Sequence, residues 1–386
     1  HGSFHDKPSI IDCPGVAGNH FICGASIRAA AHRRVTEPEK KTTTDSTDFT
    51  EAAFPPRDSG MLRDSVVKTV VCFLPETRDV AEDPVKDIAI PKADGGAGPR
   101  QPRPGWLKVR LPSGENFVQL KQLIREQRLH TVCEDARCPN IGECWGAGTA
   151  TIMILGEVCT RACGFCAVRT GRPPQYDLDE PRRVAEAIRR MGLRHAVITS
   201  VDRDDLPDGG AWIFAETIRR ARAACDGIRL EVLIPDLQGR LDALRTVVEA
   251  HPDVLAHNVE TVPRLYRTVR AGSRYPRSVG LLRNAKSLGV EVATKSSLML
   301  GLGENRDEVL EVLSDLRGAG VDILTLGQYL QPTREHLPVE RFYSPGEFEE
   351  FRLYALSLGY FHVEAGPLVR SSYHAERQAQ AVRQPS

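Results

Sequence analysis

Residues 157–166 read Glu157-Val158-Cys159-Thr160-Arg161-Ala162-Cys163-Gly164-Phe165-Cys166, directly after an apolar, strand-like run that begins at residue 150. The three cysteines are spaced C-x3-C-x2-C. Three thiolates from one loop can hold three corners of a four-iron cluster and leave the fourth iron open to another ligand. A structural zinc site usually takes four ligands in pairs instead. The spacing predicts a cluster-binding loop at the end of a strand, with Gly164 supplying backbone angles that other residues avoid.

Apolar, β-rich runs alternate with helical patterns from residue 150 onward. The clearest helical pattern is 180–193, with Asp179 as a candidate cap and Pro181 in its first turn; 305–318 repeats it. Such alternation predicts an α/β fold with a parallel sheet, either open and doubly wound or an incomplete barrel, and periodicity leaves both open. The six predicted strands are 150–158, 195–201, 229–234, 254–259, 290–300 and 323–330.

A second cysteine triplet lies just upstream, in the stretch TVCEDARCPNIGEC at residues 131–144. Its spacing is C-x4-C-x5-C, which predicts a second cluster that again lacks one protein ligand. Far downstream, residues 370–373 read RSSY. A serine oxygen is a harder donor than a thiolate and a less usual partner for a soft cluster. Taken alone, Ser371 reads as a turn hydroxyl that bonds its own backbone.

The first triplet on a six-fold β/α repeat resembles the radical S-adenosylmethionine superfamily. Longer stretches resemble the lipoyl synthase family across residues 106–375: HTVCEDARCPNIGECW, TSVDRDDLPDGGA, AHNVETVP, LMLGLGE, LTLGQYLQPTREH and GPLVRSSYHA. The resemblance implies a partial (β/α)6 TIM-type barrel, with N- and C-terminal extensions packing over the barrel mouth.

The same resemblance implies two [4Fe-4S] clusters and S-adenosylmethionine as cofactors. Cys159, Cys163 and Cys166 then hold the radical cluster and act with Ser371 as the catalytic set. An auxiliary cluster, consumed as the sulfur source, has the ligands Cys133, Cys138, Cys144 and Ser371. The implied reaction inserts two sulfur atoms, at C6 and C8 of a protein-bound octanoyl-lysine. Acid–base catalysis does not activate such C–H bonds, so a radical cofactor is required.

Polar residues at the ends of the predicted strands are candidates for binding S-adenosylmethionine, because ligands of such folds sit at the carboxyl ends of parallel strands. Each also fits a plain loop-capping or solvated polar group. His257, in a buried-looking run, fits a satisfied core histidine, and Trp145 either a cluster shield or a core aromatic. The predicted cofactor-binding residues are Ser200, Asp202, Asn258, Glu260, Lys295 and Gln328.

The resemblance also implies partners. They are octanoylated lipoyl-carrier domains (the E2 subunit of 2-oxoacid dehydrogenases and the glycine cleavage H protein), a low-potential electron donor such as ferredoxin or flavodoxin, and a cluster-repair carrier. Rival functions are a biotin synthase-like enzyme, a methylthiotransferase, and a zinc-stabilised interaction module without catalysis. The first rival is not expected to carry the second triplet with RSSY, and the second is expected to bring an added RNA-binding module.

Bulk composition narrows the remaining classes. The chain has 386 residues, with 51 basic and 51 acidic side chains, so its formal net charge is zero. This balance predicts no nucleic-acid and no membrane partner. Six of the ten cysteines fall between residues 133 and 166, which favours metal binding over a disulfide framework. The other four read as small apolar residues: Cys13, Cys23, Cys72 and Cys225.

Four segments are expected along the chain. Residues 1–100 lack sustained periodicity and are interpreted as a disordered extension or a mis-called start. Their many acidic residues disfavour a transit peptide, so a bacterial-type cytoplasmic location is expected rather than a mitochondrial one. Residues 101–149 form the auxiliary-cluster segment, 150–335 the partial barrel, and 336–386 a C-terminal segment with the serine ligand and a polar tail.

Overall fold

The computed structural model describes residues 102–108, 115–136, 138–146 and 148–383. The predictions for residues 1–100, with Cys13, Cys23 and Cys72, lie outside the described residues. No helix of the described part is long and apolar enough to cross a membrane.

One mixed sheet organises the described chain, and its interior strands are those predicted from the apolar runs. Neighbouring strands are parallel throughout, except that β1 pairs with β2 in antiparallel fashion. The two edge strands β1 and β10 do not pair with each other, so the sheet is an open, partial barrel, which confirms the predicted fold class. In spatial order the strands are β1 (His130–Thr131), β2 (Thr151–Ile154), β5 (His195–Ser200), β6 (Arg229–Leu233), β7 (Val254–Ala256), β8 (Ala293–Leu300), β9 (Ile323–Gln328) and β10 (His362–Gly366).

The first predicted strand is two strands separated by a sharp turn. After β2 the chain passes through Leu155 and Gly156, both with positive φ (67° and 87°). It then forms β3 (Val158–Cys159), which pairs with β4 (Arg169–Thr170). The buried carboxylate of Glu180 accepts the Leu155 N–H at 2.7 Å and stabilises the turn. The cysteine loop therefore stands between two short strands of its own and does not simply extend β2.

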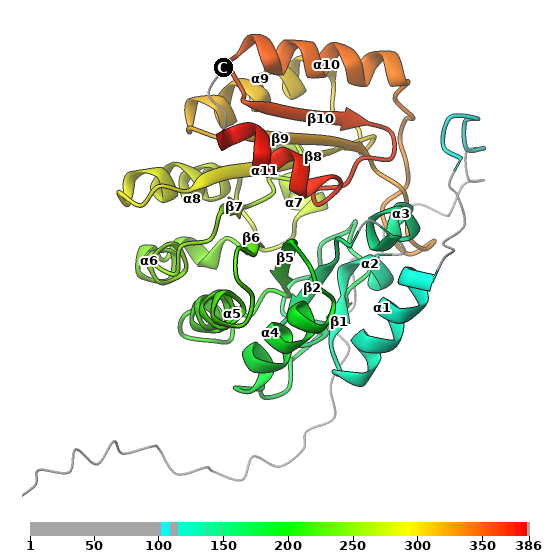
Figure 1. Cartoon of the computed structure of the whole chain (residues 1–386). Helices are drawn as coiled ribbons and strands as arrows, with labels where there is room; N and C mark the ends of the chain where they lie inside the picture. Colours follow the sequence, from blue (N-terminus) through cyan, green and yellow to red (C-terminus); the bar gives the residue numbers. More distant parts are fainter. Residues whose placement is uncertain (1–101, 109–114, 137, 147, 384–386) are drawn as a thin grey trace, which may run out of the picture. The chain divides into compact units, whose positions relative to one another are not determined.

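Helices follow the strands and lie on the outer side of the strand arc (Figure 1). Asp179 occupies the N-cap position of α4 without a capping hydrogen bond, because its carboxylate binds Arg182 instead. Pro181 lies in the first turn, as predicted. The caps of α9 and α10 are full capping boxes. The outer helices are α4 (Glu180–Arg190), α5 (Ala211–Ala224), α6 (Leu241–Val248), α8 (Tyr275–Ser287), α9 (Arg306–Gly318) and α10 (Pro345–Ser357).

Segments before and after the barrel add to its two edges. The N-terminal segment contributes α1 (Glu115–Glu126), α2 (Val132–Asp135) and α3 (Ile141–Gly146) beside β1 and β2 (Figure 1). The C-terminal segment contributes β10 and α11 (Ala375–Arg383). Ala379 of α11 packs on Val254 and Ile323, the first residues of β7 and β9. The short helices η1 (Leu237–Gly239), η2 (Pro263–Leu265) and α7 (Tyr266–Val269) lie in loops after β6 and β7.

Candidate functional site

A cavity of about 700 Å³ opens at the carboxyl ends of the parallel strands. Residues from both extensions line it, including Arg103 and Val132 on one side and Val369 and Arg370 on the other. Thus the extensions cover the barrel mouth, as the fold prediction stated. Most of the predicted site residues share this lining: Cys138, Cys159, Cys163, Cys166, Ser200, Asp202, Asn258, Glu260, Gln328 and Ser371.

Backbone hydrogen bonds hold the first cysteine loop. The Cys159 Sγ accepts the N–H groups of Arg161 (3.4 Å) and Asp202 (3.3 Å). His336 Nε2 lies 2.9 Å from the Cys166 carbonyl oxygen. Gly164 does not have positive φ, contrary to the reason given for it above; a Cβ there would lie 2.8 Å from the Leu337 side chain. The lack of a side chain at this glycine allows Leu337 to pack closely against the loop.

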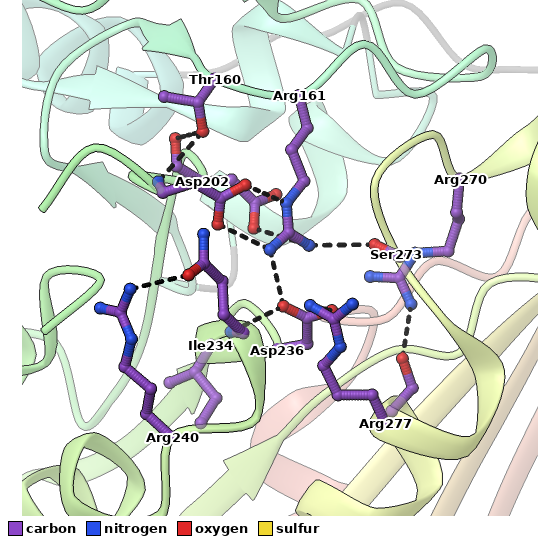
Figure 2. A network of polar contacts seen from close by, with 12 residues as sticks. Thr160, Arg161, Asp202, Ile234, Asp236, Arg240, Arg270, Ser273 and Arg277 are labelled. Atoms are coloured by element: carbon purple, nitrogen blue, oxygen red, sulfur yellow. Dashed lines mark hydrogen bonds and ion pairs between the residues drawn. The ribbon is translucent and has the colours of Figure 1, made fainter. Parts of the chain in front are cut away.

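Arg161, between two of these cysteines, is the centre of a buried ion network (Figure 2). Its guanidinium binds both carboxylate oxygens of Asp204 at 2.6 and 2.7 Å and one of Asp236 at 2.7 Å. It also lies 3.3 Å from Asp202 and donates to Ser273 Oγ at 3.0 Å. The cysteine loop is thereby tied to the loops after β5, β6 and α7. Sequence analysis missed this role, although an arginine inside a cysteine loop with three aspartates after neighbouring strands was a usable signal.

Burial raises the pKa of all three thiols in this loop. The pKa of Cys159 rises to about 12, because burial and then the Asp202 charge disfavour its thiolate, and that of Cys166 to about 11. The pKa of Cys163 rises further, mainly through burial. Without metal these thiols stay protonated near neutral pH; a bound cation makes a thiolate stable in such a place.

The second triplet is spread over two short helices and the segment between them, which carries Cys138. Cys133 lies in α2 and Cys144 in α3, and the Cys138 N–H donates to the Cys133 carbonyl at 3.0 Å. Trp145 is buried, and its ring contacts the ring of Phe117 of α1 in a tilted arrangement with centroids 5.1 Å apart. Burial raises the pKa of these thiols as well, that of Cys144 to about 12. Only Cys138 of the three lines the cavity, so the other two stand behind it.

The donor set fits iron–sulfur clusters. All seven cysteines in the described part of the chain are free thiols. Among those residues no three His, Cys, Asp or Glu side chains converge where a single metal ion could bind. A cubic cluster sets no such requirement, since each thiolate binds a different iron. Two triplets of buried or half-buried thiols, one of them entirely in the cavity wall, therefore suit clusters with an open corner.

The two serines of the RSSY stretch differ in their surroundings. The Ser372 Oγ accepts a hydrogen bond from Thr151 Oγ1 of β2 at 2.9 Å. Ser371 lines the cavity, and its hydroxyl makes no hydrogen bond to any described residue. Of the two, Ser371 is the one with an oxygen available to a ligand.

Several predicted cofactor residues present unused polar atoms to the cavity. Ser200 Oγ and Asn258 Oδ1 are buried and have no partner among the described residues. Asn258 Nδ2 donates to Glu260 Oε1 at 3.0 Å, and Glu260 stands at φ 63°. Burial raises the pKa of Asp202 to about 6 against the opposing effect of Arg161. Buried polar atoms without partners are costly, so these atoms mark a place for a polar ligand.

The side chains of Lys295 and Gln328 bind other groups of the protein. Lys295 is fully buried, its Nζ lies 2.8 Å from Glu231 Oε1, and it is not part of the cavity lining. The Gln328 amide donates to the carbonyls of Leu300, Tyr329 and Arg341 and accepts from the Tyr343 N–H. Sequence alone does not reveal these partners, because they come from distant strands and loops.

His257 is a core histidine. One ring nitrogen lies 2.8 Å from the Ile234 carbonyl oxygen and the other 2.9 Å from Ser278 Oγ. Burial, and next the Arg270 charge, lower its pKa to about 4. The neutral ring therefore joins the loop after β6 to α8.

Comparison with known proteins gives concordant matches. Residues 153–316 match the Radical SAM superfamily, and residues 85–138 match the N-terminal domain of lipoyl synthase of the Radical SAM family. The lipoyl synthase of Rubrobacter xylanophilus is 58% identical over 284 residues, 74% of this chain and 88% of that protein. That of Symbiobacterium thermophilum is 60% identical over 281 residues, 72% of this chain and 88% of that protein. That of Koribacter versatilis is 55% identical over 284 residues, 74% of this chain and 93% of that protein.

Proposed function

The chain belongs to the lipoyl synthase family of the radical S-adenosylmethionine superfamily, and we propose that its strand-end cavity is where sulfur is inserted into an octanoyl chain. The enzyme is a sulfur-inserting transferase that uses S-adenosylmethionine and [4Fe-4S] clusters. We assign Cys159, Cys163 and Cys166 to the radical cluster. Cys133, Cys138, Cys144 and Ser371 are assigned to the auxiliary cluster.

When bound, the cofactors supply a 5′-deoxyadenosyl radical that removes hydrogen from C6 and C8 of the octanoyl chain, and sulfur from the auxiliary cluster. The protein's part is positioning. Asp202 and Ser200 lie at the end of β5 beside the first triplet, where a carboxylate and a hydroxyl can bind the ammonium group of S-adenosylmethionine. Asn258 and Glu260 after β7 offer an amide oxygen and a carboxylate to its ribose hydroxyls.

Two features of the cavity suit radical chemistry on an alkyl chain. The three thiols of the first triplet, the Cys138 thiol of the second and Ser371 all line one cavity. Apolar residues of the same lining, such as Met153, Val201 and Leu298, offer an octanoyl chain an apolar surface. Holding the target carbon between the two clusters is a large catalytic contribution, and exclusion of water protects the radical.

Lipoyl-carrier proteins are the macromolecular substrates of this family. For this chain we propose, more narrowly, octanoylated E2 domains of 2-oxoacid dehydrogenases and the glycine cleavage H protein. Ferredoxin or flavodoxin is the proposed electron donor, and an iron–sulfur carrier is proposed to rebuild the auxiliary cluster. A cytoplasmic location is part of the same proposal.

The observation that carries the proposal is one cavity lined by the whole first triplet, by Cys138 of the second triplet and by Ser371. The test is an anaerobic reaction of the reconstituted chain with an octanoyl-lysine peptide, a reductant and S-adenosylmethionine, followed by mass spectrometry. We expect a peptide that has gained two sulfur atoms and protein that carries about eight irons. A product with one sulfur or none would redirect the assignment, and binding of only one cluster would remove the second triplet from the site.

Ser371→Ala should leave S-adenosylmethionine cleavage within about twofold while sulfur transfer falls by roughly tenfold or more, because displacement of a reacting group is costly even over short distances. Both products, 5′-deoxyadenosine and thiolated peptide, are quantified in one anaerobic reaction. Ser357→Ala on the outer helix α10 is the control and should behave as the unaltered chain. Normal sulfur transfer in Ser371→Ala would remove Ser371 from the ligand set.

A further inference from the structure

We propose that Asn140 is the positioning residue that sets Ser371 against the auxiliary cluster. This inference rests on the proposed role of Ser371 as a cluster ligand and adds the residue that places it. Asn140 lies between Cys138 and Cys144, within the spacer of the second triplet. It is buried, and it contacts both cysteines and the serine segment.

The backbone of Asn140 organises the two neighbouring cysteines. Its carbonyl accepts the Cys144 N–H at 2.9 Å, and its backbone N–H, near the Cys138 sulfur, lowers the pKa of that thiol against the larger effect of burial. Its side chain reaches in another direction, where Nδ2 donates to the Leu368 carbonyl at 2.7 Å. Leu368 lies three residues before Ser371 and 228 residues from Asn140 along the chain. One residue thus contacts both neighbouring cysteines through its backbone and the serine segment through its side-chain amide.

Two further contacts hold the same segment just after Ser371. Thr151 Oγ1 donates to Ser372 Oγ at 2.9 Å, and Tyr373 OH donates to the Glu143 carboxylate at 3.2 Å. Side chains therefore hold the segment on both sides of Ser371, whose own hydroxyl stays available at the cavity wall. This is the arrangement expected for a side chain aimed at a ligand by its neighbours.

The barrel limits the segment from the opposite side. Any Cβ on Gly327 of β9 would collide with the Val369 carbonyl, so the segment passes directly over the β9 backbone. Contacts with the β9 backbone and with the Asn140 amide therefore both constrain the segment. Ser371 and Cys138 line the same cavity.

Burial ranks the contacts. Asn140 is 6% exposed and its bond to the Leu368 carbonyl is partly buried, so deleting its donor leaves that carbonyl with few replacement partners. The Glu143 side chain is 60% exposed, and its contacts with Tyr373 and His374 compete with water. Asn140 therefore carries most of the positioning, and Glu143 adds a smaller part.

The test uses Asn140→Ala and the isosteric Asn140→Asp in the reconstituted full chain. Both keep the backbone contacts to the cysteines and remove the donor to Leu368. We expect 5′-deoxyadenosine formation within about twofold of the unaltered chain and sulfur transfer lower by roughly tenfold. Mössbauer spectra of iron-57 protein should show a weakened oxygen-ligated iron site. In the cluster-free chain, the amides of residues 368–374 should exchange hydrogen faster in the Asn140 variants than in the unaltered chain.

Matched controls separate positioning from general damage. Glu134→Ala removes a glutamate next to Cys133 that does not touch the serine segment, and should change neither sulfur transfer nor the Mössbauer spectrum. Glu143→Ala should lower sulfur transfer and weaken the oxygen-ligated iron signal, as Asn140→Ala does, but by a smaller factor. In a Ser371→Ala background, Asn140→Ala should cause no further loss of sulfur transfer, because the two changes act through one ligand.

The opposing outcomes are distinct. If both Asn140 variants transfer sulfur normally and keep the oxygen-ligated iron signal, Asn140 does not position Ser371. If cofactor cleavage, sulfur transfer and iron content fall together, Asn140 only supports the fold, and the inference is wrong. Normal sulfur transfer in Ser371→Ala would instead mean that the serine ligand itself, and the assignment on which the inference rests, has failed.

Discussion

The two cysteine triplets are held in contrasting ways. The first stands in a loop between β3 and β4 and is anchored by backbone bonds and by the buried Arg161 network. The second is spread over two short helices and the segment between them, and residues 368–374 form hydrogen bonds with that region. A buried ionic anchor holds its loop in one place, whereas contacts that are partly exposed can open. This difference suits a cluster that is retained in the first loop and, as proposed, one that is consumed in the second.

The largest expected effect separates the triplets by function. Cys163→Ala should abolish formation of 5′-deoxyadenosine, because the open iron that binds S-adenosylmethionine is lost with its cluster. Cys144→Ala should keep that reaction and abolish sulfur transfer. Each variant should bind about half the iron of the unaltered chain. Chromatography of 5′-deoxyadenosine, mass spectrometry of the peptide and iron analysis give the answer. Equal loss of both products in both variants would contradict a division of labour.

Removing the ionic anchor tests whether the first loop depends on it. Arg161→Met should lower the free energy of unfolding of the cluster-free chain by roughly 3–5 kcal/mol, since it leaves the fully buried Asp236 with less compensation. Urea unfolding followed by circular dichroism measures the change. Arg169→Met, in the same loop but exposed and paired with Glu157, is the control and should have no measurable effect. Equal stability of both variants would show that the network is not an anchor.

Acidification should weaken the barrel side of the site through His257. The histidine pKa is about 4 in the folded chain and near 6.5 when unfolded. Between these values the unfolded chain binds more protons, so the free energy of unfolding falls as pH drops from 6.5 to 4, by up to about 3 kcal/mol. His257→Gln should lack this part of the pH dependence. Urea unfolding of both chains across this range tests it, and parallel pH curves would refute a neutral buried ring.

The smallest expected effect concerns the aromatic pair of Phe117 and Trp145, next to the second triplet. Phe117→Leu removes the ring that contacts Trp145 and should lower the free energy of unfolding by about 1 kcal/mol. Thermal unfolding measures the change in the free energy of unfolding, and Val118→Ala on the exposed face of α1 is the control. A loss of free energy several times larger would mean that α1 contributes as much to stability as the first loop, and the contrast between the two regions would weaken.

Much of the barrel was readable in advance because burial leaves a periodic record. The apolar run 195–201 became β5 (His195–Ser200), and 323–330 became β9 (Ile323–Gln328). The edge strand β10 was not anticipated, since its residues 362–366 are mostly half-buried and carry a weak pattern. Likewise the run 254–259 gave only β7 (Val254–Ala256), because the chain turns away at Asn258 and Glu260 to line the cavity.

Site residues were readable where spacing alone carries the chemistry. Three thiols within one short loop necessarily lie close together. The sequence alone was therefore enough to group Cys159, Cys163 and Cys166. Lys295 shows the opposite case. Its place near a strand end suggested a cofactor contact, but its side chain is fully buried against Glu231, on a strand that only the folded sheet brings close.

Local order in the chain thus determined the two cysteine spacings, the six-fold strand–helix alternation and, through resemblance, the family. Only the tertiary structure decided that Ser371 and not Ser372 is free at the cavity, that Arg161 gathers three aspartates, and that Asn140 reaches Leu368. The reason is physical. Thiol spacing and periodicity are fixed within a few residues, whereas a hydroxyl or an amide acquires its role from whichever partner the fold brings within about 3 Å of it.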